Sequence, residues 1–163
     1  GMTFQGFLYV GIMRKDGEPY VLEYNVRMGD PECQPILMRM ESDLFEYLMG
    51  SVSGTLDTMS PISWKDKSAV CIVLASKGYP ESYPKGDEIF GLDQMFDNGF
   101  VFHAGTKKQD VKIVTNGGRV LGVTGLGDTL ESAIKHAYEI TEKISWENKY
   151  LRTDIGKKGL SYL

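Results

Sequence analysis

The fold is decided by a continuous apolar run near the middle of the chain, Ala69-Val70-Cys71-Ile72-Val73-Leu74-Ala75. A run of apolar residues without polar alternation is typical of a β-strand that is covered on both of its faces. We therefore expect a buried strand at residues 69–75, and the neighbouring segments are interpreted outward from it.

The residues after this strand predict a mostly β structure. Strands are expected at 100–103, 111–115 and 119–124, and the Asn116-Gly117 pair between the last two predicts a hairpin turn. Residues 77–87 hold two Tyr-Pro steps and two glycines, so we expect a loop there.

One long helix is expected near the end of the chain. Asp128-Thr129-Leu130-Glu131 has the pattern of a capping box, which marks a helix start. Residues 149–156 are then expected to add a last strand. The predicted apolar stripe of the helix consists of Leu130, Ala133, Ile134, Ala137, Ile140 and Ile144.

Before the central strand, residues 4–27 predict a β-hairpin. Its arms are residues 6–13 and 19–27, and Asp16-Gly17 suits a tight turn that needs positive φ. Period-two alternation divides the second arm into two faces. Val21, Glu23, Asn25 and Arg27 form one face, and Tyr20, Leu22, Tyr24 and Val26 form the apolar other face.

A helical segment is expected to follow the hairpin. Asp30 is predicted to cap it, and Pro31 suits the first helical position. Ile36, Leu37, Met40, Leu44 and Leu48 recur at helical spacing. The segment fits one helix, or two short helices of which Ser42 caps the second. Residues 50–55 indicate a break, and we expect a domain boundary near residues 51–60.

The bulk properties exclude several classes of protein. The chain has 163 residues and a formal net charge of -4, which gives no electrostatic reason to bind nucleic acid. No apolar run is long enough for a membrane span and no signal peptide is visible, so we expect a cytoplasmic protein. Cys33 and Cys71 lack metal or disulfide spacing and are expected to be reduced and buried. The Gly1-Met2 start, and strand-like sequence almost at once, suggest a fragment.

The segment most rich in possible chemistry is Glu23-Tyr24-Asn25-Val26-Arg27-Met28-Gly29-Asp30-Pro31-Glu32-Cys33-Gln34. Glu23 and Asn25 offer hard oxygens of the kind that magnesium accepts beside nucleotide phosphates. Arg27 extends the same face and is suited to phosphate or carboxylate. Asp30 and Glu32 follow at a helix start, where they could receive a substrate amine.

Each of these features also has a purely structural interpretation. A Glu-x-Asn pair on a strand is commonly a solvated face, and an acidic residue at a helix start commonly complements the helix dipole. The density of complementary polar groups favours a site. His103 and His136 are expected to be structural, and the sequence has no HExxH, Walker A or GxGxxG motif.

The polar segment and several later motifs resemble the glycinamide ribonucleotide synthetase family of ATP-grasp ligases. The resemblance covers nearly the whole chain, in order. It rests on 7–13, 23–32 with Gln34, and 42–44, and then on Ala75-Ser76-Lys77-Gly78-Tyr79-Pro80, Val101-Phe102-His103-Ala104-Gly105-Thr106, Thr115-Asn116-Gly117-Gly118-Arg119-Val120-Leu121 and Asp154-Ile155-Gly156.

The resemblance implies a two-part α+β fold. Residues 1–55 would be the carboxy-terminal segment of an ATP-grasp domain, built as a β-hairpin plus helices. Residues 56–163 would be a small β-barrel-like domain with one long helix. The amino-terminal part of the same enzyme, with the adenine pocket, would lie outside this chain, so the chain by itself is expected to be inactive.

The resemblance also implies a reaction in purine biosynthesis. ATP would phosphorylate the carboxylate of glycine, and 5-phosphoribosylamine would attack the acyl phosphate. Glu23 and Asn25 would bind Mg²⁺ (or Mn²⁺), and Asn25 would also be a cofactor-binding residue. Arg27 would be a catalytic residue that contacts phosphate. Asp30 and Glu32 would bind substrate at the glycine site.

Two other interpretations stay open at this point. The chain could come from another ATP-grasp carboxylate–amine ligase or a biotin-carboxylase relative, which would keep Glu23 and Asn25 but change residues 29–32. It could also be a non-catalytic β-rich interaction module. In that case Glu23 would be ordinary surface, and its loss would cost only a few tenths of a kcal/mol.

Overall fold

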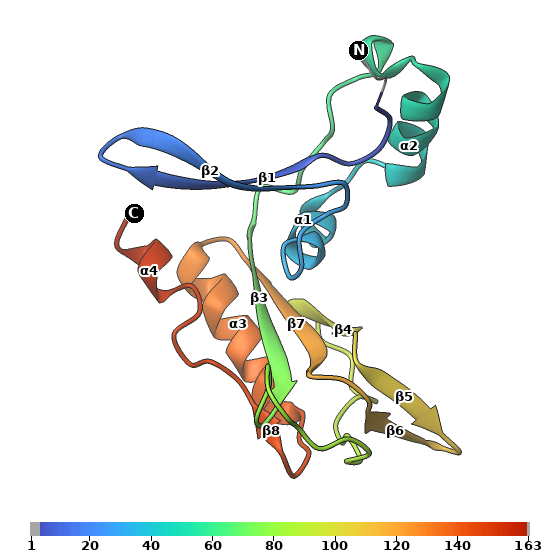
Figure 1. Ribbon diagram of the computed structural model, residues 1–163, viewed down its shortest axis with the longest axis vertical. Helices are drawn as coiled ribbons and strands as arrows, with labels where there is room; N and C mark the ends of the chain where they lie inside the picture. Colours follow the sequence, from blue (N-terminus) through green and yellow to red (C-terminus); the bar gives the residue numbers. More distant parts are fainter. Residues whose placement is uncertain (1–3, 163) are drawn as a thin grey trace.

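The computed structural model describes residues 4–162, which form two parts (Figure 1). The hairpin β1–β2 and helix α2 lie in one part, and the other part is a sheet with helices α1 and α3 packed on it. The elements are β1 (Tyr9–Lys15), β2 (Glu18–Asn25), α1 (Cys33–Arg39), α2 (Leu44–Ser53), the short 3-10 helix η1 (Leu56–Thr58), β3 (Ser68–Ser76), β4 (Gly99–His103), β5 (Thr106–Gln109), β6 (Lys112–Thr115), β7 (Arg119–Gly127), α3 (Leu130–Lys143), β8 (Lys149–Tyr150) and α4 (Lys157–Leu160).

The predicted central strand is confirmed. β3 spans Ser68–Ser76, and its side chains Ile72 and Leu74 are fully buried. It pairs with β7 on one side and β8 on the other in an antiparallel sheet of order β4-β7-β3-β8. Helices α1 and α3 both contact β3 and β7. The apolar run lacks alternation because the sheet has packing partners on both faces.

Glycines in β7 let the two helices approach the sheet. A methyl group at Gly125 would lie 2.6 Å from the backbone oxygen of Ala133 and closer still to the backbone nitrogen of Ala137, both in α3. A methyl group at Gly122 would instead face Cys71 of β3 and Gln34 of α1, at 3.3 and 3.5 Å. Because side chains alternate along a strand, these two glycines lie on opposite faces. Helix α3 therefore packs on one face of β7 and α1 on the other.

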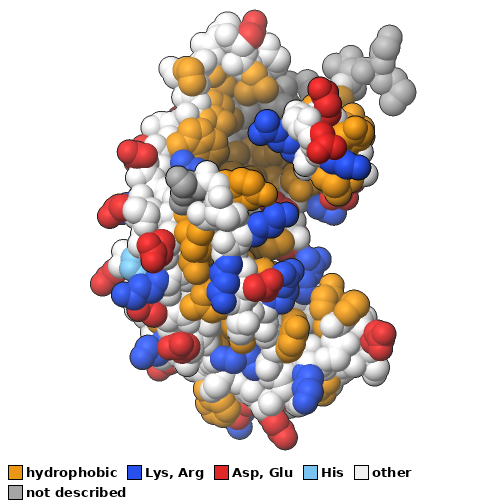
Figure 2. All heavy atoms as spheres, turned by 90° about the vertical axis from the view of Figure 1, so that its left-hand side faces the viewer, with side chains coloured by type: hydrophobic (Ala, Val, Ile, Leu, Met, Phe, Trp, Pro, Cys, Tyr) orange, Lys and Arg blue, Asp and Glu red, His pale blue; other side chains and the backbone are white. Residues whose placement is uncertain are grey.

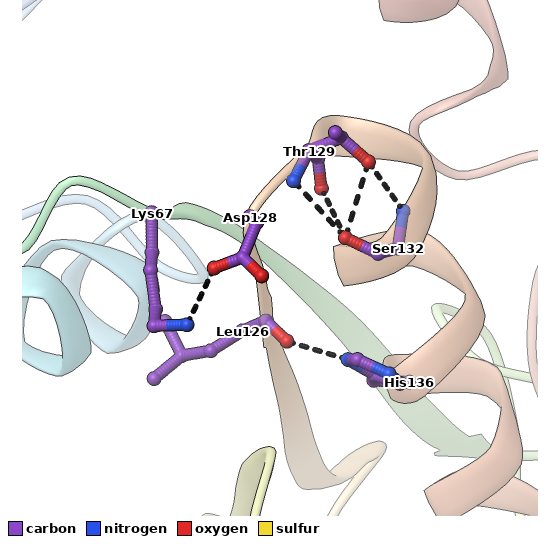
Figure 3. A network of polar contacts seen from close by, with 6 residues as sticks. All are labelled: Lys67, Leu126, Asp128, Thr129, Ser132 and His136. Atoms are coloured by element: carbon purple, nitrogen blue, oxygen red, sulfur yellow. Dashed lines mark hydrogen bonds and ion pairs between the residues drawn. The ribbon is translucent and has the colours of Figure 1, made fainter.

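Helix α3 begins one residue later than the predicted capping box. Thr129 is the N-cap and its hydroxyl accepts a hydrogen bond from the amide of Ser132 at 3.1 Å (Figure 3). The predicted capping pair of Asp128 and Glu131 is wrong, because Asp128 lies outside the helix and pairs with Lys67 at 2.7 Å. The predicted stripe is largely confirmed, with Ala133, Ala137, Ile140 and Ile144 buried.

Both histidines make local hydrogen bonds. His136 Nδ1 lies 2.6 Å from the carbonyl oxygen of Leu126, which ties α3 to the end of β7 (Figure 3). His103 Nδ1 lies 3.0 Å from the hydroxyl of Thr106. These contacts agree with the structural interpretation of the two imidazoles.

The hairpin predicted at Asn116-Gly117 is wrong. Strand β6 pairs with β5, and β7 pairs with β3 and β4, so the strands on either side of Asn116-Gly117 belong to different sheets. Neither residue has the positive φ that a tight two-residue hairpin turn requires. The β5–β6 hairpin turns instead at Asp110, whose φ is 54°.

The α+β composition is confirmed in its coarse form, whereas the barrel-like shape is not confirmed. The four-stranded sheet ends at β4 and β8 and stays open, and β5–β6 form a separate two-stranded sheet. The strand expected at residues 149–156 is reduced to β8, Lys149–Tyr150. So short an edge strand has too few backbone groups to continue the sheet toward closure.

The predicted first hairpin is confirmed, including its turn. Asp16 and Gly17 have φ values of 52° and 88°. The pairing shifts between Gly11–Glu23 and Ile12–Val21, which leaves Leu22 without an opposite residue. This irregularity interrupts the strict alternation expected along β2.

Two short helices follow the hairpin, and both predicted caps are wrong. The Asp30–Pro31 peptide is cis and α1 begins only at Cys33, with Glu32 as its N-cap. Asp43 caps α2 by accepting from the amide of Phe45 at 2.8 Å. The hydroxyl of Ser42 is engaged elsewhere, because it accepts from the amide of Ser63.

The expected break at residues 50–55 is confined to the end of that range. Helix α2 continues to Ser53 and ends at Gly54, whose φ is 69°. The domain boundary near residues 51–60 stays a prediction. Residues on its two sides are hydrogen-bonded, since the amide of Lys65 donates to the carbonyl of Arg39 at 2.8 Å.

Two bulk expectations can be compared with the structure. Both cysteines are free, as predicted, but each is only half-buried, because Cys33 starts a short helix and Cys71 faces the less completely covered side of the sheet. Among residues 4–162, no helix is long and apolar enough to cross a bilayer.

The two β7 glycines give a matched stability test. Gly125→Ala forces a methyl group onto the backbone of α3, so we expect the free energy of unfolding to fall by about 3 kcal/mol. Gly122→Ala meets only side chains that can move, and we expect a loss below about 1 kcal/mol. Urea unfolding followed by tryptophan fluorescence measures both, and equal losses would contradict the packing described here.

Candidate functional site

The polar segment of residues 23–32 lies where the hairpin ends and the chain crosses to α1. Glu23 is exposed on β2 and pairs with Gly11 of β1. A methyl group at Gly11 would lie 2.9 Å from Cγ of Glu23. The absence of a side chain at Gly11 therefore leaves room for the Glu23 side chain to lie across the neighbouring strand.

Asn25 ends β2 opposite Tyr9. Its Nδ2 atom is buried and has no hydrogen-bond partner among residues 4–162. Buried amides are nearly always hydrogen-bonded in native proteins, so an unpaired one needs an explanation. Since the oxygen and nitrogen of a carboxamide are assigned from their partners, either atom can face a ligand here.

Tyr9, Gly29 and Glu32 pack together beside this strand end. A methyl group at buried Gly29 would lie 2.8 Å from Cδ of Glu32 and 3.0 Å from Cε2 of Tyr9. The pKa of the Tyr9 phenol is raised, first by the carboxylate of Glu32, then by burial and by Glu23, while Arg27 opposes the shift. Tyr9, Glu32, Glu23 and Arg27 therefore share one electrostatic environment, and the phenol of Tyr9 stays protonated at neutral pH.

Arg27 and Asp30 are held by different partners. Arg27 is exposed and donates from Nη1 to the carbonyl oxygen of Met28 at 3.1 Å. Asp30 points to the sheet, where its Oδ2 lies 3.2 Å from Nη2 of Arg119. Nη1 of Arg119 also donates to the backbone oxygen of Asp30 at 3.2 Å. Asp30 and Glu32 therefore face different neighbours, although both lie in one short loop.

The negative charge of the loop that holds Asp30 and Glu32 affects a thiol in the central sheet. The pKa of the Cys71 thiol is raised, chiefly by burial, and the carboxylates of Asp30 and Glu32 add to the shift against a lowering contribution from Thr124. Cys33 responds in the same direction, because burial and the Asp30 carboxylate both raise its pKa. Negative charge on the loop thus disfavours a second negative charge nearby.

Three residues of this region were not predicted from the sequence. Tyr9 could have been found from the hairpin register, because a partner of Asn25 must face the same side. Gln34 of α1 has a buried Oε1 without a hydrogen-bond partner among residues 4–162, and its Nε2 would lie 3.5 Å from a methyl group at Gly122. Arg119 reaches Asp30 from β7. Neither contact leaves a local sequence signal, since both join segments that are distant along the chain.

The donor set is compatible with a divalent cation only in part. Residues 4–162 contain no group of three or more His, Cys, Asp or Glu side chains that could hold a metal ion. Glu23 and Asn25 supply two hard-oxygen donors at the end of one strand. Magnesium commonly takes one or two protein ligands and completes its shell with phosphates and water, so these two donors fit such a cation.

Comparison with known proteins identifies the class and then the family. Residues 1–33 match the description "Phosphoribosylglycinamide synthetase, ATP-grasp (A) domain", which places the hairpin and the polar segment among ATP-grasp proteins. Residues 69–158, which hold the sheet and α3, match "Phosphoribosylglycinamide synthetase, C domain". The chain belongs to the phosphoribosylglycinamide synthetase family, and the resemblance found in the sequence is confirmed.

Individual relatives agree with this assignment. The chain is 49% identical to the phosphoribosylamine–glycine ligase of Vibrio parahaemolyticus over 99% of its own length and 38% of that protein. It is 45% identical to the enzyme of the same name from Rhodopirellula baltica, over 96% of this chain and 36% of that protein. The crystal structure of the phosphoribosylamine–glycine ligase of Thermotoga maritima matches with a TM-score of 0.77 and 42% identity, over 90% of this chain and 36% of that one. The chain therefore spans little more than a third of these relatives.

The surroundings of Tyr9 predict that its pKa depends on the carboxylate of Glu32. Glu32→Gln removes the largest cause of the raised phenol pKa, so the pKa of Tyr9 should fall toward its ordinary value. Glu18→Gln, on the same hairpin, is the matched control and should leave it unchanged. Carbon-13 NMR titration of labelled tyrosine, with Tyr9→Phe to assign the signal, measures the change. An unaltered Tyr9 pKa in Glu32→Gln would show that Glu32 does not face the phenol.

Proposed function

We propose that this chain is part of a phosphoribosylamine–glycine ligase. In the proposed reaction, a carboxylate oxygen of glycine attacks the γ-phosphorus of ATP and ADP leaves. The amine nitrogen of 5-phosphoribosylamine then attacks the acyl carbon of glycyl phosphate, loses a proton and displaces phosphate. The observation that carries the proposal is the cluster of Glu23, Asn25, Arg27 and Glu32 in the segment that matches an ATP-grasp domain.

Glu23 and Asn25 are proposed to bind Mg²⁺ or Mn²⁺ together with the phosphates of ATP. The divalent cation would neutralise negative charge on the transferring phosphoryl group. The chain's own contribution is the carboxylate of Glu23, laid across Gly11, and the carboxamide of Asn25, whose buried Nδ2 has no partner among residues 4–162. An unpaired buried amide of this kind is stabilised when a ligand takes up its free hydrogen-bonding capacity.

Arg27, Asp30 and Glu32 are proposed to act on the substrates. Within residues 4–162, the exposed guanidinium of Arg27 bonds only to the neighbouring Met28, so it can turn toward a phosphate with little structural cost. Asp30 and Glu32 would receive the ammonium group of glycine. Tyr9 remains a phenol at neutral pH and can donate a hydrogen bond within the same cluster.

The exposed apolar face of the hairpin is proposed to pack against the preceding part of the same enzyme. The large apolar residues of this region that are more than half exposed are Leu8, Ile12, Tyr20, Val21, Leu22, Tyr24 and Val26. Figure 2 shows hydrophobic side chains in a hollow in the upper half of the view, beside the hairpin. An apolar surface of this extent is unusual on a free surface and typical of an interface.

We also propose that the complete enzyme works in the cytoplasm.

Glycine-dependent ADP release by the complete product of the encoding gene tests the reaction. With ATP, magnesium and phosphoribosylamine, we expect turnover in the wild type and a loss of about 100-fold or more in Glu23→Ala, because a charge-stabilising group is removed. Glu18→Ala, on the same hairpin, is the control and should keep full activity. ADP release with a different carboxylate or amine would indicate a sister ligase. No ATP hydrolysis with any substrate would leave the interaction-module interpretation.

Removal of divalent cations gives a separate prediction. A chelator should abolish ADP release by the complete enzyme, and added Mg²⁺ or Mn²⁺ should restore it. A cation is needed because the oxygens of Glu23 and Asn25 can bind the ATP phosphates only through one. The concentration of Mg²⁺ that gives half-maximal activity should rise about tenfold in Asn25→Ala, which loses one ligand. Activity that persists in the chelator would contradict the assignment.

A further inference from the structure

Three segments that carried the family resemblance meet at one corner of the sheet, residues 117–119. The hydroxyl of Ser76 donates to the carbonyl of Gly117 at 3.1 Å, and the amide of Ser76 donates to that of Gly118 at 2.8 Å. From the third segment, the amide of Gly105 donates to the carbonyl of Arg119 at 2.9 Å. The backbone of the corner is therefore bonded to two separate parts of the chain.

Close packing fixes the same corner. A methyl group at Gly118 would lie 2.7 Å from Cε2 of Tyr79, and one at Gly117 would lie 2.8 Å from Cα of Gly105. Neither glycine leaves space for a side chain, and Gly118 is buried. The Arg119 side chain thus leaves the sheet from a base that is held by hydrogen bonds and by contact.

From this base the Arg119 side chain extends to the acidic loop, residues 29–32. Its guanidinium bonds both the carboxylate and the backbone oxygen of Asp30, each at 3.2 Å. The two residues are 89 positions apart in sequence, so the contact joins the two parts of the molecule. The side chains are 41% and 51% exposed, and ion pairs with that exposure add little to stability. A two-point contact nevertheless fixes orientation, because a planar fork bonded to both backbone and side chain restricts loop rotation.

We infer that Arg119 is a positioning residue for the ligase reaction. It does not contact the reacting atoms. It holds the loop of residues 29–32, and with it the Asp30 and Glu32 carboxylates, in the place where they receive the amino acid substrate. The inference rests on the proposed function. It gives the corner built from residues 76, 105 and 117–119 a role in substrate recognition in addition to its place in the fold.

Steady-state kinetics of the complete gene product test this inference. In Arg119→Met, kcat/KM for glycine should fall by about 100-fold, because misplacement of a substrate-binding group by about 1 Å costs that much. The KM for ATP should change less than about twofold, because the proposed metal ligands Glu23 and Asn25 lie on the hairpin and not on the loop that Arg119 holds. Arg119→Lys keeps the charge without the fork, so it should recover part of the loss.

Arg152→Met is the matched control. Arg152 also pairs with an aspartate, Asp154, at 2.9 and 2.6 Å, and borders the same cavity of about 270 Å³ as Arg119. It has no hydrogen bond or ion pair to the acidic loop, so glycine kinetics should stay within about twofold of wild type. The Asp30→Asn/Arg119→Met double variant should have a kcat/KM for glycine no lower than that of the less active single variant, because both substitutions break the same Arg119–Asp30 contact.

Hydrogen exchange supplies a readout that does not depend on turnover. Amides of residues 29–33 should exchange faster in Arg119→Met than in wild type, while those of β3 stay protected. Unchanged loop exchange and glycine KM in an active, folded Arg119→Met would overturn the inference and leave the proposed reaction intact. Equal losses for glycine and ATP with β3 exposed would show a structural role only, and would overturn it too. A wild type without glycine-dependent ADP release would overturn the reaction, and the inference with it.

Discussion

The close approach of two helices to strand β7 is the constraint on which the rest of the structure depends. Gly125 admits the backbone of α3 on one face, and Gly122 admits Gln34 of α1 on the other. The packing buries Ile72, Leu74 and Val123 completely. Because α1 follows directly after the acidic loop, the same packing that forms the core also sets where residues 29–32 lie.

The candidate site is accordingly divided between two parts of the fold. The hairpin contributes Glu23, Asn25 and Tyr9, and the glycine at position 29 lets Glu32 lie against the phenol. The sheet contributes Arg119, which holds Asp30 from the other side. The two acidic residues of this short loop therefore have different protein partners, Arg119 for Asp30 and Tyr9 for Glu32.

The local features that the sequence could predict are those governed by neighbouring residues. The Asp16-Gly17 turn, the buried run at 69–75 and the stripe of α3 follow from backbone preference and periodicity, and the structure has each of them. The errors have a common origin. Asn116-Gly117 has the composition of a hairpin turn, but Gly105 occupies the space beside Gly117 and the chain passes to another sheet. The predicted helix caps are wrong by one or two residues, because Ser42, Asp128 and Asp30 instead bond to Ser63, Lys67 and Arg119.

The sequence by itself determined the family, the central strand, the long helix and the list of polar residues between Glu23 and Glu32. It could do so because these are properties of residue order and spacing. Only the tertiary structure decided that the sheet stays open, that Glu32 lies against the Tyr9 phenol, and that Arg119 holds Asp30 across 89 residues. Contacts of that kind arise when distant segments pack together, and no local pattern of side chains encodes which arginine meets which carboxylate.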